Sequence, residues 1–274
     1  MTRPAATGSL GGAVTRPTSA IAAVHDRREL PGPFDLIGDV HGCREELEDL
    51  LATLGWVLTE GADGRAESAR HPGDRTAIFL GDLVDRGPDT PGVLRLAMRM
   101  VVDGVALAIS GNHEVKLLRA LLGRGTSRTH GRAVSLEQLA TESEPFLTEV
   151  IDFLDELDTH YVLDSGRLVV AHAGLPERFH GVDSGRARAL ALFGETTGYT
   201  EHGFPVRYPW ARDYRGRALV VYGHTPIRQT SWVNNTICLD TGCVFGGELT
   251  ALRYPEREVV AVRARRAHWK QPGW

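Results

Sequence analysis

Short apolar runs alternate with helical patterns along the middle of the chain. Six apolar or β-branched stretches stop at Gly, Asp, Asn or His: FDLIGDV, TAIFLGDLVD, VALAISGN, RLVVAHAG, ALVVYGHT and TICLDTG. Runs of this length predict buried strands. Between the early runs, Leu47, Leu50, Leu51 and Leu54 follow the i, i+3, i+4, i+7 spacing of an amphipathic helix, and residues 146–157 follow it approximately. The pattern therefore predicts strands and helices in alternation.

The last third of the chain changes to strand signals. The stretches LTALRY and EVVAVRA are separated by PERE, and this arrangement predicts a β-hairpin. Helices early and strands late favour an α/β fold, with a β-sandwich of two sheets flanked by helices rather than a barrel.

The two ends of the chain lack these patterns. Residues 1–30 are rich in Ala, Gly, Thr, Pro and Ser without a hydrophobic period, so they cannot bury enough surface to offset the entropy of ordering. We expect a disordered leader over 1–30, one domain over 31–265, and a flexible tail over 266–274.

Composition narrows the class of protein. The chain has 274 residues and 42% hydrophobic content, enough for one sizeable core, and its net charge of −4 gives no global basic field for nucleic acid. Cys43, Cys238 and Cys243 form no C-x-x-C pair, and their odd number fits reduced thiols. Without an apolar run of spanning length or a signal-peptide pattern, we expect a soluble cytoplasmic protein, with no membrane partner and no obligate protein partner.

Polar side chains follow five of the predicted strands. They are Asp39 and His41 in GDVHG, Asp82, Asp85 and Arg86 in GDLVDRGP, Asn112 and His113 in SGNHE, His172 in AHAG, and His224 in YGHTP. In open α/β sheets the ligand crevice lies at the carboxyl ends of the strands. These side chains are therefore predicted to meet in one active site there.

The residue types at these strand ends suit metal ions. Two carboxylates, three imidazoles and one amide oxygen, with no thiolate, favour Mn²⁺, Fe or Zn²⁺ over a Cys-rich structural zinc. Six ligands are too many for one open catalytic metal. Two ions about 3.5–4 Å apart, bridged by a shared carboxylate and a water, would use them all.

The ordered set GDVHG, GDLVDRG, GNHE, HAG and GHTP resembles the signature of the calcineurin-like metallophosphoesterases, the phosphoprotein-phosphatase family, over residues 34 to about 262. Within it, the stretch from LFGETTGYTEHG to GGELTALRYPER is most similar to the phosphatase domain of bacterial polynucleotide kinase-phosphatase. The small bacterial bis(5′-nucleosyl)-tetraphosphatases share much of the pattern. The resemblance implies a four-layer fold and a binuclear metal centre.

The resemblance also distributes the ligands. It implies Asp39, His41 and Asp82 around one divalent metal, with Asp82 bridging to a second metal held by Asn112, His172 and His224. Manganese is the expected metal, with Fe, Zn or Ni as alternatives. The expected reaction is hydrolysis of a phosphate mono- or diester by a metal-bridging hydroxide.

Four further residues receive roles around the metals. The planar guanidinium of Arg86 is suited to clamp two phosphate oxygens, and Asn112 would also contact substrate. His113 can protonate the leaving group as general acid, and Asp85 would hold His113 in its charged form. Asp240 in LDTGC could orient His224 or another ligand by accepting a hydrogen bond from it.

The sequence leaves the substrate open. A P-loop is absent from the sequence, so no kinase module is expected. Phosphates of nucleotides or RNA ends, a dinucleoside polyphosphate and a phosphoprotein all remain candidates. The stretch RYPWARDYRGR could pair a phosphate and stack a base, or its aromatic residues could be anchors on the core. A non-catalytic binding module is disfavoured because every role of a catalytic set is filled.

Overall fold

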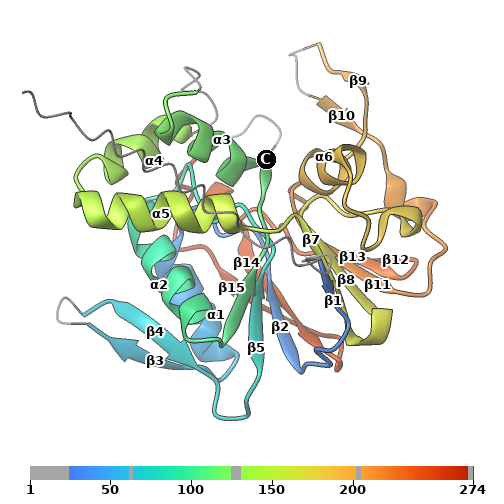
Figure 1. Cartoon of the computed structure of the whole chain (residues 1–274), viewed down its shortest axis with the longest axis horizontal. Coiled ribbons are helices and arrows are strands. Elements are labelled where there is room, and N and C mark those ends of the chain that lie inside the picture. Colours follow the sequence, from blue (N-terminus) through green and yellow to red (C-terminus); the bar gives the residue numbers. More distant parts are fainter. Residues whose placement is uncertain (1–24, 62–63, 125–130, 202–204, 271–273) are drawn as a thin grey trace, which may run out of the picture.

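Two β-sheets face each other in the structure, a computed structural model that describes residues 25–61, 64–124, 131–201, 205–270 and 274 (Figure 1). The first sheet has the strand order β15-β14-β2-β5-β6. Its strands are β2 (Phe34–Ile37), β5 (Thr76–Phe79), β6 (Ala106–Ala108), β14 (Glu248–Tyr254) and β15 (Glu258–Arg263). Strands β2, β5 and β6 are parallel, whereas β14 and β15 form an antiparallel hairpin at one edge.

The second sheet has the strand order β1-β7-β8-β11-β13-β12. Its strands are β1 (Asp26–Arg27), β7 (His160–Leu163), β8 (Leu168–Ala171), β11 (Leu219–Tyr222), β12 (Trp232–Val233) and β13 (Thr236–Cys238). Strands β8, β11 and β13 are parallel, so their carboxyl ends lie at the same edge of the sheet.

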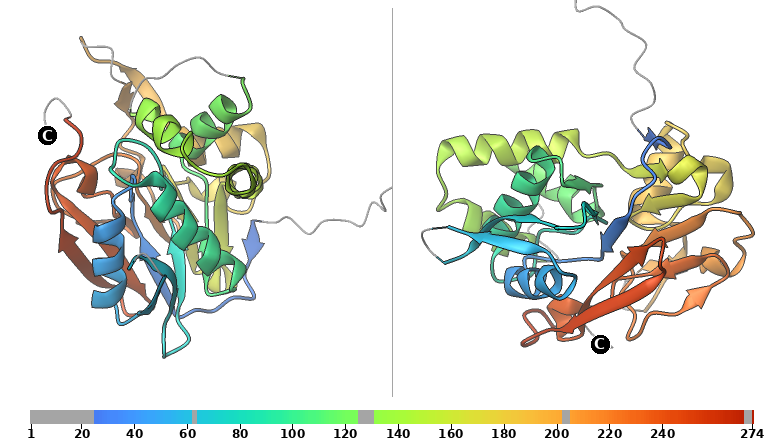
Figure 2. Two further views of the ribbon diagram at one scale, coloured as in Figure 1. Left: turned by 90° about the vertical axis from the view of Figure 1, so that its left-hand side faces the viewer. Right: turned by 90° about the horizontal axis from the view of Figure 1, so that it is seen from below.

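Helices lie outside the two sheets, mostly on the side of the five-stranded sheet (Figures 1 and 2). They are α1 (Arg44–Thr53), α2 (Thr90–Val102), α3 (Asn112–Leu121), α4 (Arg132–Leu139), α5 (Glu144–Glu156) and α6 (Gly185–Phe193). Helices α1 to α5 lie on the side of the five-stranded sheet, and α6 lies beside the six-stranded sheet. Two small antiparallel pairs project from this body: β3 (Val57–Glu60) with β4 (Ala66–Arg70), and β9 (Thr196–Tyr199) with β10 (Pro205–Arg207).

Successive residues of the central strands face different cores. Leu36 and Ile78 pack between the sheets with Val170 and Val221 of the opposite sheet. Their neighbours Ile37 and Phe79 pack instead against leucines of helix α1 and residues of helix α2. Because side chains alternate across a strand, a sheet buried on both faces needs continuous apolar runs, and this is the pattern that the sequence has.

The predicted α/β fold with two sheets is confirmed. The predicted strands and helices lie at the positions that the hydrophobic pattern indicated. The six apolar runs contain β2, β5, β6, β8, β11 and β13, and the two helical stripes are α1 and α5. The C-terminal hairpin is present, with paired residues from Glu248 and Arg263 to Arg253 and Glu258. Strands β3, β4, β9 and β10 were not predicted, because they are short and largely exposed.

The ends of the domain differ from expectation where they are described. Strand β1 pairs in parallel with β7, so residues 25–30 of the expected leader belong to the folded body, while 1–24 lie outside the described residues. In the expected tail, Trp269 and Trp274 pack against the core. Hydrophobic contacts over a long sequence distance order these segments, and no local period signals such contacts.

Two further findings bear on the class of protein. The three cysteines are free and buried. Over the described residues, the structure has no helix that is both long and apolar enough to cross a membrane.

Candidate metal centre

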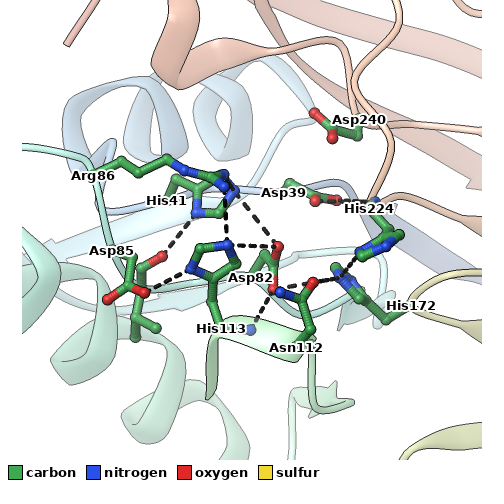
Figure 3. Close-up of polar contacts among 12 residues, drawn as sticks. Asp39, His41, Asp82, Asp85, Arg86, Asn112, His113, His172, His224 and Asp240 are labelled. Carbon is green, nitrogen blue, oxygen red and sulfur yellow. Dashed lines mark hydrogen bonds and ion pairs between the residues drawn. The ribbon is translucent and has the colours of Figure 1, made fainter. Parts of the chain in front are cut away.

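Strand ends from both sheets deliver the predicted ligands to one place (Figure 3). Strands β2 and β5 lead into Asp39 and Asp82, and β8 and β11 of the other sheet lead into His172 and His224. Asn112 begins helix α3, a few residues after β6. Side chains far apart in the sequence therefore share one site between the two sheets.

The backbone of the site is held in an unusual conformation. Five non-glycine residues have a positive φ: His41 (46°), Asp82 (50°), Asp85 (73°), Arg86 (70°) and His224 (73°). Each such conformation costs on the order of 1–3 kcal/mol and persists only where the surroundings enforce it. This concentration of backbone strain at the strand ends points to a functional site.

Two glycines allow the carboxylates to approach the backbone. A Cβ on Gly111 would lie 2.2 Å from Asp82 Oδ1, and a Cβ on Gly223 would lie 1.9 Å from Asp39 Oδ1. Neither contact is sterically tolerable, so a larger residue at either position would displace a carboxylate. The glycines of GNHE and YGHTP therefore have a packing role beside two candidate metal ligands.

Asp82 lies between two groups of potential metal ligands. One oxygen, Oδ2, is 3.6 Å from His41 Nε2, and the other, Oδ1, is 3.3 Å from His172 Nε2. The ligand atoms of His41, Asp82 and His113 lie within 4.8 Å of one another, as do those of Asp82, His172 and His224. A carboxylate with one oxygen toward each group has the geometry of a bridge between two cations.

Asn112 and Asp39 lie at the edge of these two groups. Asn112 Oδ1 is 3.2 Å from His172 Nε2, on the side of the second group. The carboxylate of Asp39 accepts a hydrogen bond from the His224 amide, with 3.0 Å between Oδ2 and N. In the first compact group His113, rather than Asp39, stands with His41 and Asp82.

Hydrogen bonds to backbone carbonyls orient two of the imidazoles. His41 Nδ1 donates to the carbonyl of Val84 at 2.8 Å, and His172 Nδ1 donates to that of Leu80 at 2.9 Å. Each bond leaves the Nε2 atom facing Asp82. Histidine ligands of metals are held in this way, because a bond from one ring nitrogen fixes the tautomer and the direction of the other.

Positive charge already stands where cations would bind. The Arg86 guanidinium donates to His41 Nε2, and it donates to His113 Nε2 at 3.0 Å. Burial lowers the pKa of His172, but the charge of Asp82 outweighs burial and raises the pKa to about 10, so this imidazole holds a proton. A guanidinium and a protonated imidazole therefore place positive charge among the candidate ligands.

The remaining donor atoms also fit metal binding. His224 Nε2 is buried without a hydrogen-bond partner among the described residues. Burial raises the pKa of Asp82, yet His172, His113 and His41 outweigh it and hold the pKa well below its usual range, so the carboxylate is ionised. An ionised, buried carboxylate with imidazoles on both sides is a donor set that suits divalent cations.

His113 and Asp85 form the predicted pair. His113 Nδ1 and Asp85 Oδ2 are 2.6 Å apart, and both side chains are buried. However, burial lowers the pKa of His113 well below its usual range. Arg86 donates to Nε2, so Nδ1 is the nitrogen of His113 that donates to Asp85, and burial opposes the charged form expected from the sequence.

Asp240 contacts the backbone rather than His224. Its Oδ1 accepts a hydrogen bond from the Gly242 amide at 3.1 Å, whereas His224 Nδ1 lies 3.1 Å from His172 Nε2. Burial raises the pKa of Asp240 to about 6. Burial is the largest cause of the raised pKa of Asp39, and the negative charge of Asp240 is the second. Asp240 thus acts through charge on Asp39, a candidate metal ligand.

Glu114 is a residue of the site that the sequence reasoning missed. Its Oε2 accepts from the amides of Gly111 (2.7 Å) and Asp82 (2.8 Å), and its Oε1 accepts from those of Leu83 (2.8 Å) and Val84 (3.3 Å). It therefore fixes the turn that carries Asp82. The signal available in the sequence was an acid at the third position of helix α3, the place of a capping box.

Comparison with known proteins agrees with this geometry. The family model described as calcineurin-like phosphoesterase matches residues 32–262. The asymmetrical bis(5′-nucleosyl)-tetraphosphatase PrpE of Anoxybacillus flavithermus is 40% identical over 234 residues, which cover 84% of this chain and 93% of that protein. The protein of the same name from Geobacillus thermodenitrificans is 40% identical over 240 residues, which cover 86% of this chain and 96% of that protein.

Solved structures share the architecture. The crystal structure of a proposed diadenosine tetraphosphatase matches with a TM-score of 0.62 at 27% identity, over 90% of this chain and 98% of that one. A protein serine/threonine phosphatase from Saccharomyces cerevisiae matches with a TM-score of 0.57 at 15% identity, over 92% of this chain and 86% of that one. This likeness shows a common fold. The chain therefore belongs to the calcineurin-like phosphoesterase family and is a metal-dependent hydrolase of phosphate esters.

Proposed function

We propose that this protein hydrolyses dinucleoside tetraphosphates asymmetrically. One water is consumed, the bridge between an α- and a β-phosphate breaks, and a nucleoside monophosphate and a nucleoside triphosphate leave. The observation that carries this proposal is the 40% identity to enzymes of that name over 93% and 96% of their length. The ligand set around Asp82 supports it, because an anionic polyphosphate needs concentrated positive charge.

Two divalent cations suit the centre. Asp39, His41 and Asp82 would hold one, and Asp82, Asn112, His172 and His224 would hold the other. Bound there, the cations would neutralise phosphate oxygens and lower the pKa of a bridging water. We propose Mn²⁺ at both positions, because carboxylate, imidazole and amide ligands without thiolate suit it; Fe, Zn and Ni are the competing metals.

Arg86 and helix α3 would bind the phosphates. The guanidinium of Arg86 now donates to His41 and His113, so it already reaches the middle of the site. Released from these nitrogens, its planar fork can pair with two phosphate oxygens at once. Asn112 is the first residue of α3, and the positive end of the helix dipole there favours an anion.

His113 would supply a proton to the leaving oxygen. Asp85 holds its Nδ1, so Nε2 faces the site and is the atom from which a proton can be donated. Asp85 thereby positions the imidazole and stabilises the imidazolium once Nε2 is protonated. A triphosphate is a weak base, so this assistance matters less for a dinucleotide than for an alkyl phosphate.

We also propose that the enzyme works in the cytoplasm. Three buried free thiols suit a reducing compartment, where disulfides rarely persist. The partner in this proposal is a small nucleotide substrate.

The test is a comparison of substrates with the Mn²⁺-loaded protein. We would measure kcat/KM for diadenosine tetraphosphate, p-nitrophenyl phosphate, a 3′-phosphorylated RNA oligonucleotide and a phosphopeptide, and separate the nucleotide products by chromatography. We expect the dinucleotide to be preferred and to yield AMP and ATP in equal amounts. Two ADP per substrate, or preference for the RNA end or the peptide, would overturn the proposal.

A further inference from the structure

A cavity with aromatic walls opens beside the metal centre. Its volume is about 260 Å³, and Tyr208, Trp210, Tyr222, Val233 and the metal-ligand candidate His224 are among its lining residues. The cavity lies on the outer side of the six-stranded sheet, between the base of the β9-β10 pair and strands β11 and β12. His224 therefore belongs both to the lining of the cavity and to the candidate metal centre.

We propose that this cavity holds the purine base attached to the phosphate that is attacked, an inference that rests on the proposed dinucleotide hydrolysis. When water attacks the α-phosphate, a nucleoside triphosphate leaves and a nucleoside monophosphate is formed, so the attacked phosphate carries a ribose and a base directly. The base must then lie close to the metal centre. A cavity that shares His224 with that centre meets this requirement.

Aromatic rings give the cavity the chemistry of a base site. Trp210 and Tyr222 pack edge to face, with 5.1 Å between their ring centroids. Tyr208 is 36% exposed. Nucleobases stack on such rings in many proteins, and any base can make the stack because every base has a π-face.

The wall of the cavity is fixed to the metal-ligand loop. A Cβ added to Gly174, two residues after His172, would lie 2.0 Å from Cζ2 of Trp210. The indole therefore lies directly on the AHAG turn. A base stacked on Trp210 would consequently have a defined position relative to His172 and the phosphate.

The size of the cavity favours one base over a larger group. Pockets for drug-sized ligands have volumes of about 300–1,000 Å³, so about 260 Å³ suits a single ring system. A larger cavity of about 730 Å³ lies across the wall that contains Tyr208 and Trp210. None of the six proposed metal ligands is among its lining residues, so it does not adjoin the scissile phosphate.

The sequence leaves two roles open for the stretch RYPWARDYRGR, either a site that stacks a base and pairs a phosphate or an anchor on the core. Different residues of it suit each role. Tyr214 is only 4% exposed and donates its hydroxyl to the carbonyl of Ala218, so it anchors the segment on the core. Trp210 and Tyr208 instead face the cavity, together with Arg207 and Arg212. The two arginines add positive charge to the lining of the cavity.

The experiment fills the cavity and compares two substrates. Val233 lies on the edge strand β12, where a larger side chain has room, so Val233→Trp would occupy the base site. Trp210→Ala removes the stacking wall. We expect each variant to lower the ratio of kcat/KM for diadenosine tetraphosphate to that for p-nitrophenyl phosphate by about 10-fold or more, chiefly through KM, as loss of a base stack predicts.

Trp232→Ala provides the matched control. Trp232 is 42% exposed, lies 5.3 Å from the Arg257 guanidinium, and is the neighbour of Val233 without lining the cavity. The substrate ratio of this variant should stay within about twofold of the wild type, since exposed sites away from the machinery tolerate change. An equal fall in Trp232→Ala and Val233→Trp would overturn the assignment of the cavity.

Inhibition by products separates this inference from the proposed function. With p-nitrophenyl phosphate as the substrate, AMP should inhibit the wild type at least about 5-fold more tightly than inorganic phosphate, and Val233→Trp should remove the difference. Equal inhibition by AMP and phosphate in the wild type would refute the base site even if the dinucleotide is hydrolysed. Tight AMP binding without dinucleotide hydrolysis would refute the proposed function and support the cavity.

Discussion

Replacement of Glu114 by glutamine tests whether this buried carboxylate fixes the turn that carries Asp82. The side chain is completely buried, and its two oxygens accept four backbone amides. Glutamine has the same shape but only one acceptor oxygen. Its NH₂ group must therefore face two amide donors, whichever way the side chain is turned.

The cost can be worked out from the geometry. If the NH₂ group faces Gly111 and Asp82, bonds of 2.7 and 2.8 Å are lost; if it faces Leu83 and Val84, bonds of 2.8 and 3.3 Å are lost. A buried donor left unsatisfied costs about 1–3 kcal/mol. With two donors unsatisfied, we expect Glu114→Gln to lower the free energy of unfolding by about 2–6 kcal/mol.

The assay is thermal and urea unfolding of the metal-free protein at pH 8. Burial raises the pKa of Glu114 to about 7, so at pH 8 the wild-type side chain is mostly ionised and the variant replaces a carboxylate. A chelator in the buffer separates the effect on folding from any effect on metal binding. Since about 2–4 °C of Tm corresponds to 1 kcal/mol for a chain near this size, a fall in Tm of at least about 4 °C is expected.

Glu45→Gln is the control for this prediction. Glu45 lies on helix α1 with a side chain that is 54% exposed, and its ion pair with Arg265 is on the surface. Exposed pairs contribute about 0–1 kcal/mol. A change below about 0.5 kcal/mol in Glu114→Gln, equal to that of Glu45→Gln, would refute the argument that Glu114 holds the turn.

Three further predictions concern the metals and the acid. His113→Ala should lower kcat by about 10²–10⁴-fold on an alkyl phosphate and by less on p-nitrophenyl phosphate; equal losses would exclude the general acid. Gly223→Ala should weaken Mn²⁺ binding at least about 10-fold in calorimetry, because its Cβ would lie 1.9 Å from Asp39 Oδ1, whereas Gly198→Ala, with no atom within 4 Å, should not. The pKa of His172 is raised to about 10, so a metal bound to this imidazole would displace its proton below pH 10. Calorimetry in two buffers at pH 8 should detect proton release, and Kd should fall as pH rises from 7 to 9; a Kd independent of pH would contradict this.

Much of the site could be predicted from the sequence for a simple physical reason. Parallel strands buried on both faces appear as continuous apolar runs, and the residues directly after these runs must lie at one edge of a sheet. Asp39, Asp82, Asn112, His172 and His224 were found in this way. The carboxylate, imidazole and amide groups among these residues, without a thiolate, are the ligand types that divalent cations prefer, and this inference does not require the fold.

Other features could not be read from a linear pattern. Glu114 looked like an ordinary helical acid, yet it binds the amides of a turn 30 to 32 residues earlier. The contact of Asp240 with the Gly242 amide, rather than with His224, depends on the geometry of one turn. Pairing of β1 with β7 joins residues 26 and 162, and no local period signals such a contact.

The sequence by itself determined which residue types stand at the strand ends, in which order, and therefore the reaction class. Only the tertiary structure decided how these groups face one another: that the two oxygens of Asp82 point to different imidazoles, that Arg86 lies between His41 and His113, and that Trp210 covers the turn after His172. The physical reason is that burial and periodicity are local properties of a chain, whereas the packing of two sheets and the direction of a side chain depend on contacts between residues far apart in it.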